Sequence, residues 1–403
     1  MAVSLLAHVV ISDLCLGKPA LRSLPISATI ADALAALRNS EDNFISIWDC
    51  ADHHAAHSVS VNVGGDHRSC TCTCVGKVCM VDVICYLCKD DSLLSPSTAL
   101  KAPVSAILPK IPGLVMHLEP SSSLLEAIDL ILEGTQNLVV PIQTKISNYS
   151  RRKQLQKPTT AGFATTIHNG FEYCWLTQED IIRFLLSSIG LFSPIPALSI
   201  DTLGIINTDI LAINYHSPAS SAVKAISRSL AEQTSVAVVD SEGTLIGEIS
   251  PFTLACCDET VAAAITTLSS GDLMAYIDCG GPPEDLVRLV KARLKEKNLD
   301  GMLEAYIQSA YSSSASSSSD DESSSSPPRS GKYSRSMSYS ARMVRRAEAI
   351  VCHPKSSLVA VMIQAIAHRV NYVWVIEDDC SLVGIVTFCE MLKVFREHLG
   401  SMG

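Results

Sequence analysis

The chain has 403 residues, of which 47% are hydrophobic and 18% charged, so it is an ordinary globular chain long enough for two or three domains. Its net charge of −10 argues against nucleic acid or an anionic membrane as the main partner. No apolar run approaches the roughly 18 residues that a membrane-spanning helix needs, so we expect no membrane segment.

The N-terminal segment, residues 1–17, is mildly apolar, has no basic region and contains Asp13. These features predict a first strand rather than a signal peptide. Fifteen cysteines in a chain without a secretory signal indicate a reducing compartment, where most cysteines are small buried hydrophobic residues. We therefore expect a cytoplasmic protein, with the nucleus as an additional location.

Residues 11–90 form the first of four predicted units. Within it, apolar spacing predicts a helix, a strand, and a second strand leading into a helix, at residues 30–37, 44–48 and 75–87. Residues 51–74, rich in cysteine and histidine, are expected to be an insertion between the two strands.

Residues 101–189 and 191–277 form the second and third units, which are joined by a segment containing two prolines, residues 191–196. The same order of helix, strand and strand-then-helix is expected in the second unit at residues 124–131, 137–142 and 171–185. In the third unit the helix is expected at residues 223–230 and the hairpin at residues 238–254. A polar, basic loop, residues 145–169, interrupts the second unit.

A helical insertion, residues 278–310, follows the third unit, with two prolines at its start and Leu286, Leu289 and Leu294 on one face. Residues 311–339 are predicted to be a disordered linker, because serine makes up most of the segment and leaves almost nothing to bury. The fourth unit, residues 340–399, contains a helix followed by a hairpin and a second helix.

The four units are copies of one another. Residues 238–254 align with residues 375–391 without a gap, and the two earlier units repeat the pattern more loosely. A β-turn-β segment flanked by helices cannot cover both faces of its sheet alone, whereas two such segments packed together can. We therefore predict two pairs of units in an α/β fold, with the pairs packing within a single, monomeric chain.

This repeated unit resembles the CBS repeat, and the chain is similar to the plant CBS-domain-containing proteins of the CBSX type. The resemblance implies tandem β-α-β-β-α units paired into two Bateman modules, with a disordered Ser-rich linker. It also implies a non-catalytic regulatory or sensor protein that binds an adenosine-containing ligand in the cleft between paired repeats. A partner protein, such as a kinase complex of the energy-sensing type, would respond to the bound ligand.

In that family, a serine or threonine ends the second hairpin strand and an aspartate follows at the start of the helix, where both hold the ribose. A carboxylate there can accept hydrogen bonds from the 2′ and 3′ hydroxyls, and the helix N-terminus favours phosphate. The corresponding positions in this chain are Thr177 with Asp180, Thr387 with Glu390, and Ser250, which is followed by Thr253 instead of an acid. The first unit has Met80 and Val83 there, so we expect no site in it.

Family members that sense AMP or ATP place His-Arg before the first hairpin strand, and this chain has no basic residue at those positions. Adenosine, AMP or S-adenosylmethionine is therefore favoured over ATP, unless residues 151–153 fold over the cleft. Threonine and aspartate also favour helix N-termini without any ligand, so a plain helix cap is the alternative for Thr177 and Asp180.

The insertion suggests a different function. Thiolates and imidazoles are natural zinc ligands, and Cys70, Cys72, Cys74 and His67 are the candidates for a metal or redox site. Their spacing matches no established zinc motif, so a disordered surface loop is the alternative. The chain also lacks the common nucleophile, phosphate-loop and metalloprotease motifs, and we expect no enzymatic activity. A ligand-free scaffold for protein–protein interaction remains the alternative to a sensor.

Overall fold

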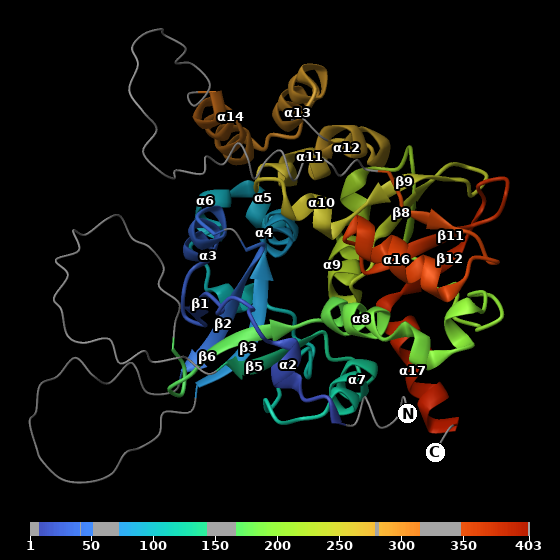
Figure 1. The fold of residues 1–403 in the computed structure, drawn as a ribbon. Coiled ribbons are helices and arrows are strands. Elements are labelled where there is room, and N and C mark those ends of the chain that lie inside the picture. The colour runs from blue at the N-terminus through green and yellow to red at the C-terminus, as the bar shows by residue number, and fades with distance from the viewer. Residues whose placement is uncertain are drawn as a thin grey trace, which may run out of the picture.

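The computed structural model describes residues 8–40, 42–50, 72–142, 167–278, 282–314 and 348–401. Within these ranges the strands form four sheets of three strands each (Figure 1). In every sheet the first strand is parallel to the second, and the second is antiparallel to the third. The predicted α/β fold of four repeated units is confirmed.

Each unit has the order strand, helix, hairpin, helix. The elements of the first unit are β1 (Ser23–Pro25), α3 (Ile30–Arg38), β2 (Phe44–Cys50), β3 (Cys72–Cys79) and α4 (Met80–Leu87). The second unit comprises β4 (Val115–His117), α7 (Leu124–Leu132), β5 (Asn137–Ile142), β6 (Glu172–Leu176) and α8 (Gln178–Ser187).

The third unit has the same order, and its first helix is preceded by a short 3-10 turn. Its elements are β7 (Ala212–Asn214), η5 (Ala219–Ala222), α9 (Val223–Glu232), β8 (Val236–Val239), β9 (Leu245–Ile249) and α10 (Pro251–Ala255). The fourth unit consists of β10 (Val351–Cys352), α16 (Leu358–His368), β11 (Tyr372–Ile376), β12 (Leu382–Thr387) and α17 (Phe388–Ser401).

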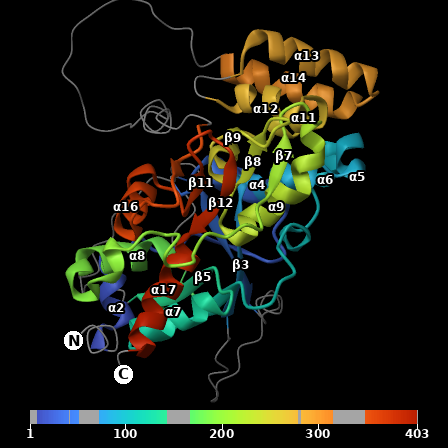
Figure 2. The ribbon, with the colours of Figure 1, turned by 90° about the vertical axis from the view of Figure 1, so that its right-hand side faces the viewer.

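In the described residues, a short helix precedes the first unit, other short helices connect the units, and four longer helices follow the third unit. The helix before the first unit is α2 (Ile11–Leu14), and the connecting helices are α5 (Asp90–Leu94), α6 (Pro96–Ala99), η2 (Val104–Ala106), η3 (Ile189–Phe192) and η4 (Ile195–Ala197). The four that follow the third unit are α11 (Val261–Thr267), α12 (Ser270–Ile277), α13 (Glu284–Glu296) and α14 (Asp300–Ser314), which pack together as Figure 2 shows.

The units pair through their sheets, the first with the second and the third with the fourth. Between the first two, the buried Trp48 ring lies 4.9 Å from the Tyr173 ring. Between the last two, the buried Glu248 accepts hydrogen bonds from the Tyr372 hydroxyl at 2.9 Å and from the Trp374 indole at 2.7 Å. These contacts confirm the predicted pairing into two modules.

Helices join the two modules. Buried residues of α4 share a hydrophobic core with α9 and α10, while α7 and α8 share another with α16 and α17. At the edge of the second core, Arg396 donates to both carboxylate oxygens of Asp129, at 2.5 and 3.1 Å. Each unit therefore contacts one neighbour through its sheet and another through its helices, and the four units surround a common centre.

Three expectations are corrected. The predicted N-terminal strand is instead the helix α2 at Ile11–Leu14, whose Ile11 is buried in the core of the second unit. The insertion was predicted to extend through residue 74, but Cys72 already pairs with Cys50, so β3 begins there. The predicted helical insertion is confirmed as α13. A further helix, α14, continues to Ser314 and so includes the first residues of the predicted linker.

The remainder of the predicted Ser-rich linker lies outside the described residues, as do His67, Cys70 and residues 151–153. In the part of the chain that the structure describes, no helix is long and apolar enough to cross a membrane.

Candidate functional site

The helix after each hairpin begins at an equivalent residue in all four units. The N-cap residues are Cys79, Thr177, Ser250 and Thr387. In the first unit, the residue three positions later is Asp82, and its Oδ2 accepts the Cys79 backbone N–H at 2.8 Å. The prediction that Met80 and Val83 occupy these positions was wrong by one residue. Cysteine replaces the hydroxyl residue there, so the sequence contained no serine or threonine to mark the register.

Thr177 and Asp180 form a capping box at the start of α8. Asp180 Oδ2 accepts the Thr177 backbone N–H and the Thr177 hydroxyl, both at 2.7 Å. The Lys18 ammonium lies 2.7 Å from the same oxygen. Neither residue lines the large cavity described below. These contacts favour the helix-cap alternative for this pair.

Ser250 is buried, with 1% of its surface exposed. Its Oγ accepts the Phe252 backbone N–H at 3.2 Å and lies 3.1 Å from the Tyr372 hydroxyl of the fourth unit. Ser250 therefore serves as a helix cap and as part of the contact between the third and fourth units.

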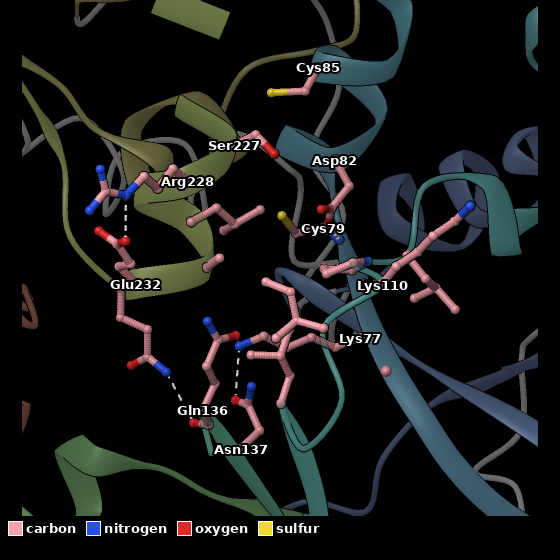
Figure 3. Close-up of a pocket in the computed structure, with 18 of the residues that line it drawn as sticks. Lys77, Cys79, Asp82, Cys85, Lys110, Gln136, Asn137, Ser227, Arg228 and Glu232 are labelled. Atoms are coloured by element: carbon pink, nitrogen blue, oxygen red, sulfur yellow. Dashed lines mark hydrogen bonds and ion pairs between the residues drawn. The ribbon is translucent and has the colours of Figure 1, made fainter. Parts of the chain in front are cut away.

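A cavity of about 1500 Å³ lies where the four units meet, and Figure 3 shows its polar lining. It contains the acid of the first unit, Asp82, and the predicted pair Thr387 and Glu390 of the fourth. Its walls also include the start of β5, the helix α9, and the segment from Ala106 to Val115 that joins the first two units. The cavity exceeds the ~300–1,000 Å³ typical of sites for one small ligand.

Asp82 and Lys77 carry the charges at the first-unit side of the cavity (Figure 3). Burial raises the pKa of Asp82 to about 6, although the Cys79 backbone N–H and the Lys77 ammonium favour the carboxylate. Burial also lowers the pKa of Lys77. The Lys77 ammonium donates to Asn137 Oδ1 at 2.9 Å and lies 4.4 Å from the centre of the Phe44 ring.

The strand register identifies the positions at which family members carry His-Arg. Asn137 is opposite Thr177, just as Tyr372 is opposite Thr387, so the second-unit positions are Gln136 and Asn137. Neither residue is basic, as predicted. However, Lys77 reaches Asn137 from the first unit and places a cation at this point of the cavity, which the sequence analysis missed.

Additional charged groups line the side formed by α9. Arg228 donates to Glu232 at 2.6 Å and to Asp209 at 3.0 Å, so its charge is largely matched by two carboxylates. Lys110 and Lys224 also line the cavity. Among the residues that the structure describes, five basic and five acidic side chains line the cavity: Lys77, Lys89, Lys110, Lys224, Arg228, Asp82, Asp90, Asp209, Glu232 and Glu390.

Thr387 and Glu390 form the fourth-unit side. Glu390 Oε2 accepts the Thr387 backbone N–H at 2.9 Å and also bonds the Thr387 hydroxyl. Burial raises the pKa of Glu390. Glu390 also borders a smaller hollow of about 250 Å³ beside Asn207 and Lys393, so its longer side chain lies between two spaces.

Of the predicted metal candidates, Cys72 and Cys74 lie in β3. The Cys74 thiol donates to the Gly76 carbonyl at 3.5 Å, and burial raises its pKa to about 12. Cys74 is not one of the residues whose ligand atoms the described structure brings together. Cys72 lies close to two other residues with ligand atoms, Cys50 and His168, which the sequence analysis did not group with it.

Comparison with known proteins agrees with these features. The CBS domain-containing protein CBSX5 of Arabidopsis thaliana is 53% identical over 407 residues, which cover 99% of each chain. CBSX6 of the same plant is 27% identical over 99% of this chain and 95% of its own length. The chain is also 22% identical to a plant protein named SNF1-related protein kinase regulatory subunit gamma-like PV42b, over 96% of this chain and 95% of that protein.

No family model matches the chain. Among solved structures, protein MJ1225 from Methanocaldococcus jannaschii has a TM-score of 0.53 at 14% identity, covering 96% of this chain and 100% of that one, which indicates a shared fold. The high identity to CBSX5 over the whole length and the four equivalent sheets lead to one assignment: this chain belongs to the plant CBS domain-containing proteins.

Proposed function

We propose that this chain is a non-catalytic regulatory protein that binds an adenosine-containing ligand in the central cavity and thereby modulates a partner protein. The observation that carries the proposal is the convergence of two helix N-termini, each with an acid in its first turn, on one cavity. Asp82 supplies the first acid and Glu390 the second.

Asp82 has the chemistry to hold a ribose. Its Oδ2 already accepts the Cys79 N–H, and an ionised carboxylate has about four lone-pair positions, so two hydroxyls of a ribose can still be bound. Glu390 offers the same groups with one more methylene. The prediction that Thr177 and Asp180 hold a ribose is not part of this proposal, because a ligand at that position would have to displace Lys18.

The rest of the lining suits a nucleoside with little negative charge. Phe44, Ile107, Leu108 and Val115 provide apolar surface beside Lys77 for an adenine base. Among the described residues, equal numbers of acidic and basic side chains face the cavity. The electrostatic contribution to binding is therefore less favourable for a triphosphate than for a monophosphate or an adenosyl compound. We therefore rank AMP, adenosine and S-adenosylmethionine above ATP.

Regulation follows from the position of the cavity. Residues from all four units line it, so a ligand that contacts several units stabilises one relative arrangement of them. A partner that prefers the same arrangement then binds more tightly in the presence of ligand, and reciprocally. A kinase complex is the proposed class of partner, since one relative is named as a kinase regulatory subunit. We propose that the chain acts as a monomer with its two modules packed together.

Isothermal titration calorimetry of the full chain with AMP, adenosine, S-adenosylmethionine and ATP tests this proposal. We expect AMP to bind, and Asp82→Asn to weaken binding by about tenfold or more, because a hydrogen bond to a charged acceptor contributes about 1.5–3 kcal/mol. Asparagine can still accept the Cys79 N–H, so the helix cap is retained. Glu390→Gln tests the fourth-unit side in the same way.

Asp180→Asn is the matched control, because this aspartate occupies the same position in its unit but lies outside the cavity. It should leave the affinity unchanged. Loss of binding in Asp180→Asn but not in Asp82→Asn would move the ligand to the second unit. If none of the four compounds releases heat, the sensor proposal fails and the ligand-free scaffold is favoured.

Binding of adenosine should also depend on pH. The Asp82 carboxylate has a pKa of about 6, and only its ionised form accepts hydrogen bonds from both ribose hydroxyls. Affinity should therefore be constant at higher pH and fall as the pH drops through about 6. Adenosine is the appropriate probe, since its lack of phosphate excludes titration of the ligand's own phosphate group. Titrations between pH 5 and 8 that show no decline, or the same decline in Asp82→Asn, contradict the assigned role.

A further inference from the structure

Cys50, Cys72 and His168 meet at the outer end of the first module, among segments far apart in sequence. Cys50 ends β2, and Cys72 is its direct partner at the start of β3. His168 forms a bridge with Phe171 just before β6 of the second unit. Their ligand atoms all lie within 4.8 Å of one another. Cys72 and His168 are each 7% exposed, and Cys50 is half-buried.

The spacing suits a tetrahedral metal ion. Cys50 Sγ and His168 Nδ1 are 3.6 Å apart. Zinc bonds of about 2.3 Å to sulfur and 2.0–2.1 Å to nitrogen, at tetrahedral angles, place these two atoms about 3.5 Å apart. This contact, an S–H···N hydrogen bond in the structure, therefore has the separation of two atoms bound to the same ion, and all three ligand atoms lie within 4.8 Å of one another.

The surrounding residues orient the imidazole. His168 Nε2 lies 3.0 Å from Ser23 Oγ, and the ring stacks on Trp48 at 3.8 Å with an interplanar angle of 5°. A hydrogen bond from Nε2–H to Ser23 leaves the Nδ1 lone pair directed at the two sulfur atoms. Outer partners of this kind are typical of metal-bound histidines, whose second nitrogen donates to an acceptor.

Cys72 is also held in place. The side-chain amide of Asn169 accepts the Cys72 backbone N–H and donates to the Cys72 carbonyl, both at 2.8 Å. The segment that carries His168 and Asn169 therefore positions both the histidine and Cys72. Protein contacts alone hold these two residues relative to one another.

We propose that Cys50, Cys72 and His168 form a zinc-binding site that joins the two units of the first module. Two thiolates and one imidazole are ligands that select Zn²⁺, and their charge balances that of the ion. Among the residues that the structure describes, these three supply ligand atoms, and a fourth ligand completes a tetrahedral set. The proposed zinc site is separate from the proposed adenosine site, because none of its three residues lines the central cavity. The zinc proposal therefore does not depend on the adenosine proposal.

Titration of the reduced, metal-free full chain, without an affinity tag, with Co²⁺ and then Zn²⁺ tests this site. Co²⁺ should produce visible d–d absorption and a sulfur-to-cobalt charge-transfer band, both removed when Zn²⁺ displaces it. Because two thiolates contribute, Cys50→Ser and Cys72→Ser should each reduce the charge-transfer band by about half or abolish it. His168→Gln should shift the d–d bands.

Cys74→Ser is the matched control, because Cys74 lies on the same strand two residues from Cys72 but outside the group. It should leave the bands unchanged. Ser23→Ala removes only the outer hydrogen bond and should weaken Zn²⁺ binding by about 10–100-fold in a chain that still folds, as circular dichroism will verify. A wild-type chain that binds no Co²⁺, or bands that Cys50→Ser and Cys72→Ser leave intact, overturns the proposal.

Discussion

Replacing Glu248 by alanine should lower the free energy of unfolding by about 2–4 kcal/mol, because two hydrogen bonds to a charged acceptor are lost. Glu248 is 6% exposed and belongs to β9 of the third unit. Its two oxygens accept the Tyr372 hydroxyl and the Trp374 indole N–H of the fourth unit, at 2.9 and 2.7 Å. In the alanine variant the Trp374 N–H stays buried without its charged acceptor, while the Tyr372 hydroxyl still has Ser250 Oγ, at 3.1 Å.

Chemical denaturation followed by tryptophan fluorescence measures this effect, and Trp374 itself is part of the signal. Glu242→Ala, in the exposed turn of the same hairpin, is the matched control and should change stability by less than about 0.5 kcal/mol. Glu248→Gln should lie between them, because its amide still offers one acceptor oxygen. Equal stability of Glu248→Ala and Glu242→Ala would show that these hydrogen bonds do not hold the second module together.

Gly384→Ala should destabilise the protein by about 1–3 kcal/mol, which is typical of an overpacked core. A Cβ there would lie 2.6 Å from the Asn207 carbonyl oxygen and 2.7 Å from Ile206 Cγ2. That carbonyl cannot retreat easily, because it accepts the Ile385 N–H at 2.9 Å and Asn207 donates back at 2.9 Å. A methyl group therefore forces this bridge to lengthen or break.

Gly76→Ala provides the comparison. This glycine lies in the equivalent hairpin strand of the first unit, and a Cβ there would meet Leu108 Cδ2 at 2.7 Å. A leucine methyl can rotate away, whereas a hydrogen-bonded carbonyl cannot, so the thermal midpoint should fall less than in Gly384→Ala. If the two variants have the same thermal midpoint, or if Gly76→Ala has the lower one, then the contact with the Asn207 carbonyl is not the cause of the destabilisation.

The close contacts at Gly76 and Gly384 explain why glycine recurs in the second strand of the hairpins. A glycine occupies the same strand position in the first, third and fourth hairpins, at Gly76, Gly247 and Gly384. In the structure, the connecting segment that leads to the second unit crosses Gly76, and the one that leads to the third crosses Gly384. A strand without a side chain at that point allows another backbone to pass close to it.

The predicted elements of the last three units are confirmed because their signals are local. Alternating apolar residues and a polar turn predicted the hairpin at residues 238–254, and the structure forms it from β8 and β9, with β8 beginning two residues earlier, at Val236. A hydroxyl residue at each helix start marked Thr177, Ser250 and Thr387 correctly. In the first unit, Cys79 replaces the hydroxyl, and its N-cap function is apparent only from its pairing with Phe44.

The amino-acid sequence alone determined the repeated unit, the number of copies and the residues that begin the helix after the hairpin in the last three units. These follow from apolar spacing and capping chemistry, which act over a few residues. Only the tertiary structure decided which acids share a cavity, because Asp82, Lys77 and Glu390 come from distant segments. It likewise separated Asp180, held by Lys18, from the cavity, and brought His168 to Cys50 and Cys72. Which residues come together depends on how the sheets and helices of different units pack against one another. A local sequence pattern does not contain this information.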